Sequence, residues 1–392
     1  MKIMILSAAT GGGHLRAAHA VESYILNNSQ GNSVLVVDTL KCIGSLVDHT
    51  CCDGYKLMVK RVPKAFGTLY KVTNKETPMK RLMFHWNNSL SEKLIPLMEK
   101  EKPSVILSTH PFATEMASCL KRSGVLAGVP LICLMTDYGP HQAWIADLVD
   151  AYVVSNEGMV PQMERMGVDP QTVYPFGIPV KDVFFQPGDK RALRERFGLD
   201  PDKQTVLFMA GSFGVSNVIR IYEDVCTLDL DFQVIVITGK NDRLYREFEQ
   251  AAARTGKHTR LVFFTNEVEN YMHASDLLVT KPGGLTVSEA LACGIPLAVF
   301  DAIPGQEEDN ADFLLNHHMA VKLDSHTDTA QTIAMLLEDE HELASMRASC
   351  ERFDKSKSAQ NIFMLMRELY DRYHPEKAAP ARKDAQTLSG GA

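Results

Sequence analysis

The sequence has few of the patterns that mark a membrane-spanning, disulfide-bonded or nucleic-acid-binding protein. No apolar stretch approaches the roughly 18 to 20 residues that a membrane-spanning helix needs. The eight cysteines include no C-x-x-C pair, so reduced thiols are the simpler expectation. The formal net charge of −7 argues against binding to nucleic acid. The N-terminus enters a strand pattern directly, without a signal peptide, and we expect a cytoplasmic protein.

The patterns for two common nucleotide loops and for a metal site are also missing. The glycines at 11–13 are followed by His14, without the Lys-Ser/Thr pair of a hydrolase loop or the third glycine of a dinucleotide fingerprint. Residues 200–202 and 229–231 have D-x-D spacing, but each precedes a strand pattern instead of following one. We therefore expect no metal ion and no cofactor.

What the sequence does contain is an alternation of short apolar runs with helical patterns. Continuous apolar runs are typical of buried parallel strands, and their alternation with helices predicts an α/β fold with doubly wound sheets. A polar, turn-rich segment over 181–203 interrupts the alternation, which then restarts. The 392 residues are thus expected to form two domains, over 1–180 and 181–350. A helix is expected over 351–374, and the tail over 375–392 is expected to be disordered.

The first apolar run, KIMILS, leads through the glycines into a helical pattern. Apolar side chains recur at helical spacing from Leu15 to Leu26, which places His14 in the first helical turn. Glycine tolerates positive φ and leaves room for a close approach, and helix N-terminal amides favour an anion. The turn therefore predicts close approach by a ligand, although tight packing alone explains such turns in many α/β folds.

A second glycine turn, at Gly283 and Gly284, ends a strand pattern and precedes a helix expected over 286–292. The free amides at the start of this helix suit a diphosphate. Glu289 lies early in the same helix. Its carboxylate either caps the helix or accepts both hydroxyls of a ribose, as the acidic residue of dinucleotide sites does.

Gln306 and Glu307 are expected in a Pro-Gly loop after the next strand. An amide beside a carboxylate suits sugar hydroxyls, which need both donors and acceptors. The alternative is a polar surface turn without a ligand.

These motifs resemble those of the monogalactosyldiacylglycerol synthase and processive diacylglycerol glucosyltransferase family. That family is related to the peptidoglycan enzyme that adds N-acetylglucosamine to a lipid-linked muramyl peptide. The resemblance covers residue 1 to about residue 370. It is carried by K-P-G-G-L-T-x-S-E-A-L-A-x-G-x-P, P-G-Q-E-E-x-N and T-G-G-G-H-x-x-A-A, and by shorter matches at 108–111, 136–144 and 176–180.

The resemblance implies a GT-B fold, in which two Rossmann-like domains face each other across a cleft and a C-terminal helix crosses back onto the first. It implies an inverting transfer of a hexose from a UDP-sugar to diacylglycerol, by an enzyme peripheral on the inner face of the cell membrane. Three alternatives remain: transfer to another lipid-linked acceptor such as a peptidoglycan precursor, a UDP-sugar epimerase, and a non-catalytic UDP-sugar sensor. Glucose and galactose are both candidate sugars, and the number of sugars added is open.

The resemblance also implies the substrate-binding residues, position by position. It places Gly283, Gly284 and Thr286 at the diphosphate, Glu289 at the ribose, and Gln306 and Glu307 at the sugar. It places the glycine loop of Gly211, Ser212 and Phe213 near the phosphates or uracil. Three further glycines are expected at the substrates: Gly12, Gly13 and Gly177.

An inverting transfer needs a general base for the acceptor hydroxyl, and histidine is the commonest choice. His14 lies where the acceptor and the diphosphate are expected to meet, so it is the first candidate. Some relatives carry an acidic residue just before the glycine turn, but this chain has Ala9 there. His110 and Asp137 are the second choices. Hydrogen bonding to the diphosphate or the acceptor is the alternative role for His14.

Residues 53–81 depart from the overall acidity, with eight lysines or arginines against two carboxylates, a net charge of +6. Apolar and aromatic side chains lie between the cations, which suits an anionic membrane surface. The alternative is a solvated basic face with its apolar side in the core. The residues predicted to bind the membrane are Lys56, Lys60, Arg61, Lys64, Phe66, Tyr70 and Lys71.

Overall fold

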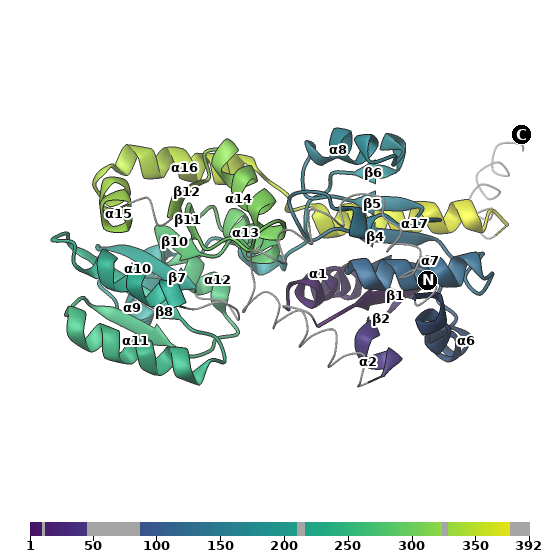
Figure 1. Ribbon diagram of the computed structural model, residues 1–392, viewed down its shortest axis with the longest axis horizontal. Coiled ribbons are helices and arrows are strands. Elements are labelled where there is room, and N and C mark those ends of the chain that lie inside the picture. The colour runs from purple at the N-terminus through teal and green to yellow at the C-terminus, as the bar shows by residue number, and fades with distance from the viewer. Residues whose placement is uncertain (10–11, 45–86, 210–215, 324–327, 377–392) are drawn as a thin grey trace, which may run out of the picture.

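The structure, a computed structural model, describes residues 1–9, 12–44, 87–209, 216–323 and 328–376. Two parallel six-stranded sheets, each with helices packed around it, lie side by side along the long axis of the molecule (Figure 1). Each is a Rossmann-like unit, as the alternation of strand and helix patterns predicts.

The first sheet has the order β2-β1-β3-β4-β5-β6. Its strands reproduce the apolar runs of the first half of the sequence, because buried parallel strands need apolar side chains on both faces. They are β1 (Lys2–Ser7), β2 (Ser33–Asp38), β3 (Val105–Ser108), β4 (Leu131–Leu134), β5 (Ala151–Val153) and β6 (Val173–Tyr174).

The second sheet has the order β12-β11-β10-β7-β8-β9. Its strands are β7 (Gln204–Met209), β8 (Phe232–Ile237), β9 (Thr259–Val262), β10 (Leu277–Thr280), β11 (Leu297–Phe300) and β12 (Ala320–Leu323).

Helices connect and cover the strands. In the first unit they are α1 (Gly13–Asn28), α2 (Thr39–Ile43), α6 (Ile95–Glu101), α7 (Pro111–Arg122) and α8 (Met159–Arg165). In the second they are α9 (Lys190–Arg196), α10 (Ser216–Cys226), α11 (Asp242–Thr255), α12 (Val268–His273), α13 (Gly284–Ala292), α14 (Gln306–Asn316), α15 (Thr329–Glu338) and α16 (Glu340–Arg352). The last helix is α17 (Ser358–Tyr373). Across the described residues, every helix is too short or too polar to span a bilayer.

The order of the strands reverses at one point in each sheet. In the first sheet the chain winds outward from β1 and β3, and in the second from β7 and β10. Ligands of open α/β sheets bind at such switch points, beyond the carboxyl ends of the strands. The fold therefore directs attention to the loop after β1, the loop after β3 and the loop between β10 and α13.

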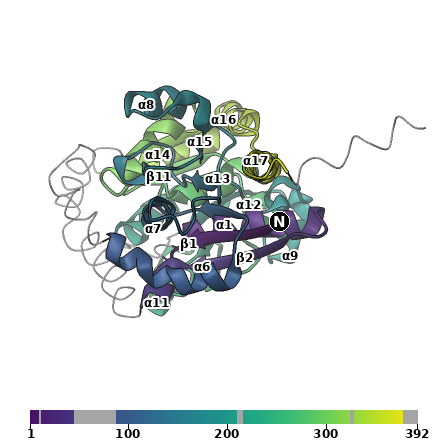
Figure 2. The ribbon, with the colours of Figure 1, turned by 90° about the vertical axis from the view of Figure 1, so that its right-hand side faces the viewer.

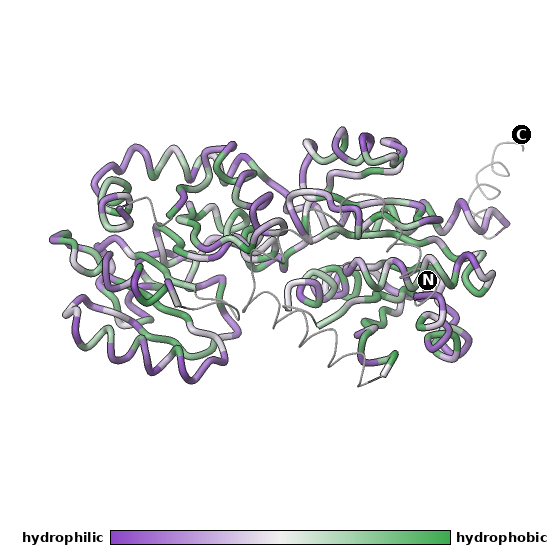
Figure 3. The backbone as a smooth tube through the Cα atoms, in the orientation of Figure 1, coloured by the Kyte–Doolittle hydropathy of each residue, from purple (hydrophilic) through white to green (hydrophobic). Residues whose placement is uncertain are grey.

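The strands consist largely of hydrophobic residues, whereas hydrophilic residues are frequent along the outer helices (Figure 3). One apolar cluster is continuous across both units. It includes Ile3 and Val21 of the first unit and Leu285 and Leu314 of the second, all of them buried. The two units thus share part of their core in this structure.

Helix α17 returns to the first unit, where it lies beside α1 (Figures 1 and 2). At its end, the Tyr373 hydroxyl donates a hydrogen bond to Asp150 at 2.5 Å and accepts one from Lys121 at 3.0 Å. The expected crossing-back helix is therefore present, and its last turn is anchored on the first unit.

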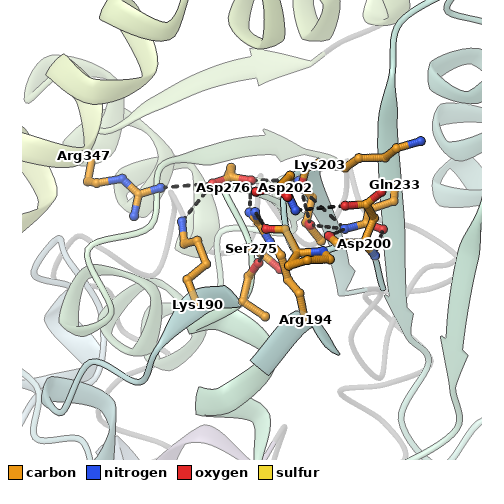
Figure 4. A network of polar contacts seen from close by, with 12 residues as sticks. Lys190, Arg194, Asp200, Asp202, Lys203, Gln233, Ser275, Asp276 and Arg347 are labelled. Atoms are coloured by element: carbon orange, nitrogen blue, oxygen red, sulfur yellow. Dashed lines mark hydrogen bonds and ion pairs between the residues drawn. The ribbon is translucent and has the colours of Figure 1, made fainter. Parts of the chain in front are cut away.

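Asp276 directly precedes β10, at the amino ends of the strands of the second sheet. Its carboxylate is the centre of a polar network (Figure 4). Its carboxylate accepts hydrogen bonds from Lys190 at 2.8 Å and from Arg194 at 2.6 Å, both on α9. The Thr205 amide at the start of β7 donates to it at 2.8 Å, and Arg347 of α16 lies 3.7 Å away. One carboxylate thus joins two helices to the sheet.

The structure corrects three local expectations. The polar segment over 181–203 contains a short helix, α9, because its cations have a buried partner in Asp276. Helix α13 begins at Gly284, two residues earlier than expected. Gln306 and Glu307 do not lie in a loop but form the first turn of α14, where the Glu308 side chain accepts from the Gly305 amide and closes the helix start.

Candidate active site

His14 lies at the switch point of the first sheet. Its Nδ1 is 2.8 Å from the carbonyl oxygen of Thr109, which follows β3, and 2.8 Å from Oγ1 of Thr136, which follows β4. A carbonyl oxygen only accepts hydrogen bonds, so Nδ1 carries the hydrogen and Nε2 carries the lone pair. The histidine is therefore held as the tautomer that accepts a proton at Nε2.

The pKa of His14 is lowered to about 4 by desolvation, against which the Thr109 carbonyl acts in the opposite direction. The imidazole is thus neutral at physiological pH. Its ring lies edge-on to that of His110, with centroids 4.7 Å apart, and 6.0 Å from that of Trp144.

His110, a second choice for the base, is held in the opposite tautomer. It is the N-cap of α7, and its Nδ1 accepts a hydrogen bond from the Phe112 amide at 3.2 Å. The neutral ring therefore carries its hydrogen on Nε2 and presents a donor there. Burial, and next the neighbouring His14, hold the pKa of His110 well below its usual value.

Asp137, the other second choice, is buried and lies near the predicted sugar-binding carboxylate, Glu307. Burial raises the pKa of Glu307, the Ile303 amide and Lys281 lower it, and Asp137 raises it further. The Ile303 amide donates to Glu307 Oε2 at 2.8 Å. The structure thus brings carboxylates of the two domains close enough to interact electrostatically.

Glu289, the predicted ribose-binding residue, lies in the second turn of α13 and is only 3% exposed. That position is too far along the helix to cap it, so the capping interpretation is wrong. Both carboxylate oxygens accept from one nitrogen of Arg16, at 2.9 and 3.1 Å. Burial raises the pKa of Glu289 to about 7 although Arg16 acts to lower it.

Two of the predicted substrate-binding glycines, Gly284 and Gly13, lie at contacts between the two units. A Cβ atom on Gly284 would lie 2.0 Å from the Thr136 carbonyl oxygen, so no larger residue is accommodated there. One on Gly13 would lie 3.6 Å from Leu285 Cβ. Close packing between domains is therefore one reason for glycine at these turns, and their role at a substrate stays a prediction.

Gly177 has φ +92 and faces the stem of Lys355, in the segment that leads to α17. Its carbonyl accepts a hydrogen bond from Ser358 at 2.7 Å. Gly12, with φ +79, is the N-cap of α1 and uses the left-handed conformation that glycine favours. Thr286 lies half-buried in the first turn of α13.

Several predicted residues lie outside the residues that the structure describes. They are Gly211, Ser212 and Phe213 of the glycine loop and Lys56, Lys60, Arg61, Lys64, Phe66, Tyr70 and Lys71 of the basic segment. Gln306 is placed as the first residue of α14. Among the described residues, no group of three His, Cys, Asp or Glu side chains is arranged to hold a metal ion.

Sequence reasoning missed the residues that join the domains. The Tyr138 amide donates to Asn310 Oδ1 at 2.7 Å, and its hydroxyl lies 2.9 Å from Ser288 Oγ. Asn310 in turn donates to the Pro282 carbonyl at 2.9 Å. The motif letters contain Ser288 and Asn310, but nothing in their spacing indicates a partner more than a hundred residues away.

Comparison with known proteins agrees with the motifs. Residues 14–180 match the family described as monogalactosyldiacylglycerol (MGDG) synthase, and residues 189–356 match the family described as glycosyl transferases group 1. The chain is 26% identical over 361 residues to the processive diacylglycerol beta-glucosyltransferase of Bacillus pumilus, covering 92% of this chain and 93% of that protein. The predicted resemblance is thereby confirmed.

Solved structures agree on the fold. The crystal structure of MurG from Acinetobacter baumannii matches with a TM-score of 0.65 at 15% identity, covering 94% of this chain and 99% of that one. Anabaena Alr3699/HepE in complex with UDP-glucose matches with a TM-score of 0.57 at 17% identity, covering 94% and 100%. The GT-B arrangement of two Rossmann-like domains is confirmed.

Proposed function

We propose, from its confirmed resemblance to the monogalactosyldiacylglycerol synthase and processive diacylglycerol glucosyltransferase family, that this protein transfers a hexose from a UDP-sugar to diacylglycerol. The product would be a glycolipid, made by a peripheral enzyme at the inner face of the cell membrane. The matched families and the name of the Bacillus pumilus relative support this reaction.

In the proposed reaction, the acceptor hydroxyl attacks C1 of the hexose from the face opposite the diphosphate. The bond between C1 and the diphosphate oxygen breaks, and UDP leaves with the electron pair. His14 Nε2 takes the hydroxyl proton. One displacement at C1 inverts its configuration, so an α-linked donor gives a β-linked glycolipid.

The rest of the site would bind the donor. Glu289 would accept the ribose hydroxyls, and Gln306 and Glu307 would bind hydroxyls of the hexose. The amides at the start of α13 would face the diphosphate, where they stabilise the negative charge that grows on the leaving UDP. This chemistry needs only groups that the chain itself supplies.

The observation that carries the proposal is the pair of hydrogen-bond contacts at His14 Nδ1. The Thr109 carbonyl and the Thr136 hydroxyl fix both the ring and its tautomer at the switch point of the first sheet. A base that is already oriented contributes typically about 10²- to 10⁴-fold to a proton transfer.

The test is the identity of the lipid product. The protein is incubated with vesicles of anionic phospholipid and diacylglycerol, in parallel with UDP-glucose, UDP-galactose or UDP-N-acetylglucosamine. Mass spectrometry of the lipid extract is expected to find a hexosyl diacylglycerol with one of the two hexose donors. The coupling constant of its anomeric proton is expected to be that of a β-linkage.

The same assay separates the alternatives. Product from UDP-N-acetylglucosamine alone, or only with a lipid-linked peptidoglycan precursor added, would replace diacylglycerol by another acceptor. A changed sugar nucleotide without any glycolipid would point to an epimerase. Binding of UDP-sugar without any product would point to a sensor, and each of these results contradicts the proposal.

A further inference from the structure

Arg16 and Glu289 form an ion pair between the two domains. Arg16 lies on α1 of the first domain and Glu289 on α13 of the second, 273 positions apart in the sequence. The glutamate side chain is 4% exposed, whereas that of Arg16 is 49% exposed. The pair thus has a fixed, buried acceptor and a donor on a long side chain with room to move.

The two helices begin at the same place. Gly13, the first residue of α1, lies against Leu285, the second residue of α13. Arg16 lies three residues beyond the start of α1 and Glu289 five residues beyond the start of α13, which is roughly 5 Å and 8 Å along the two helices. The ion pair therefore joins the first two turns of both helices.

We propose that Arg16 is a donor-binding residue that exchanges partners. In the nucleotide-free protein it neutralises Glu289, and when ribose hydroxyls occupy Glu289 it turns to the diphosphate of the same donor. The inference rests on the proposed function, because it takes Glu289 as the ribose acceptor.

Competition for the carboxylate is the first reason. Arg16 uses both oxygens of Glu289, and a ribose needs the same two oxygens for its hydroxyl groups. Glu289 is also the more buried partner, so the exposed guanidinium is the group that leaves. A ribose therefore competes with Arg16 for the same two oxygens.

Charge balance is the second reason. A displaced guanidinium beside two helix N-termini is in a strongly electropositive place, which favours an anion. The planar fork of arginine suits phosphate oxygens. A diphosphate supplies the lost negative charge, whereas a nucleoside without phosphate does not.

The test compares uridine with UDP by isothermal titration calorimetry on the whole protein. In Arg16→Gln the carboxylate has no competitor, so uridine is expected to bind at least about threefold more tightly than to the unchanged protein. UDP is expected to bind about tenfold more weakly, because its diphosphate loses a charged hydrogen-bond donor. Arg16→Lys is expected to regain part of the UDP affinity.

The matched control is Arg243→Gln, which removes an exposed pair with Glu247 on α11, within the second domain. Its two affinities are expected to equal those of the unchanged protein. Equal changes of the uridine and UDP affinities in Arg16→Gln, or no change in either, would overturn the exchange of partners. Failure of the unchanged protein to bind UDP would instead overturn the proposed function itself.

Discussion

At the scale of single residues, His14 is held ready to accept a proton but is a weak base in the nucleotide-free protein. Desolvation lowers its pKa to about 4, which keeps the ring neutral but reduces its affinity for a proton. An anion bound nearby favours the protonated ring and raises the pKa. The diphosphate of the donor would therefore strengthen the base at the moment when it is needed.

This balance predicts the titration of His14. In the nucleotide-free protein, the ring signals of His14 in NMR spectra are expected to stay constant from pH 8 to pH 5.5, because the pKa lies near 4. Addition of UDP is expected to move the titration to higher pH. The signals are assigned by their loss in His14→Gln. A midpoint near the ordinary value of 6.5 without UDP would contradict the buried, neutral ring.

Glu289 gives a second prediction with the opposite sign. Burial raises its pKa to about 7 in the folded protein, against 4.5 as the ordinary value, while Arg16 and Lys181 act to lower the pKa and Glu269 raises it. Between pH 4.5 and pH 7, Glu289 is protonated in the folded state but ionised in the unfolded state. The free energy of unfolding therefore decreases as pH rises through this range. Glu289→Gln removes that decrease.

The melting temperature of Glu289→Gln relative to the unchanged protein is therefore expected to rise by a few degrees between pH 5 and pH 8. His14→Gln is expected to change the slope in the other direction, because a group whose pKa is lowered stabilises the fold as pH rises from 4 to 6.5. Parallel melting curves for Glu289→Gln and the unchanged protein would show that Glu289 titrates near its ordinary value.

At the scale of elements, Thr136 connects the start of α13 to the candidate base. Its hydroxyl contacts His14 Nδ1, and its carbonyl oxygen occupies the space that a Cβ on Gly284 would fill. The position of α13 and the orientation of His14 therefore both depend on Thr136. A shift of one displaces the other.

Gly284→Ala tests this connection. The added methyl group would lie 2.0 Å from the Thr136 carbonyl oxygen, so the two domains must separate. A misplacement of about 1 Å costs roughly 10²-fold in rate, and we expect a loss of this size in kcat. The control is Gly128→Ala, at a glycine with open space around it. Full activity of Gly284→Ala would show that the reaction does not need this close contact between the two domains.

The Asp276 network allows a prediction about the stability of the fold that does not depend on the active site. Asp276→Asn leaves Arg194, only 6% exposed, without its carboxylate. Breaking a buried pair from one side costs about 3 to 5 kcal/mol. Asp202→Asn breaks the exposed pair with Arg191 in the same region and is expected to cost less than about 1 kcal/mol. Urea unfolding measures both, and equal costs would contradict the role of Asp276.

The elements also show what the sequence could predict. Apolar runs such as KIMILS became β1, because burial on both faces leaves a readable signal. Helix α9 was missed, because its polar residues find their partner at Asp276 only in the folded chain. The Arg16–Glu289 pair was not predicted for the same reason: the two residues lie 273 positions apart, and no local pattern records their contact.

At the scale of the whole molecule, the two domains contact each other at the candidate site. The Arg16–Glu289 pair, the contact of Gly284 with Thr136 and the hydrogen bonds of Tyr138 all join the domains. The first two involve groups expected to bind the donor. When a UDP-sugar binds, these groups would therefore have to give up contacts with the other domain and form contacts with the donor.

The basic segment over 53–81 lies outside the described residues, and its role at the membrane stays a prediction. Each cation near an anionic surface contributes about 1 kcal/mol, so changing Lys60, Arg61 and Lys64 to alanine is expected to weaken vesicle binding roughly 100-fold. The control removes three cations of α11, Arg243, Arg246 and Arg254. Co-sedimentation with anionic vesicles measures both variants. Equal binding of the two variants to the vesicles would show that another surface of the protein binds the membrane.

The most direct test of the central claim, that His14 serves a hexosyl transfer to diacylglycerol, is the rate of lipid-dependent UDP release for three proteins. The unchanged protein is expected to release UDP from one UDP-hexose only when the vesicles contain diacylglycerol. His14→Gln is expected to lose about 10²- to 10⁴-fold in rate. His19→Gln, at an exposed histidine further along the same helix, is expected to keep the full rate. A full rate in His14→Gln, or release that ignores diacylglycerol, would contradict the account.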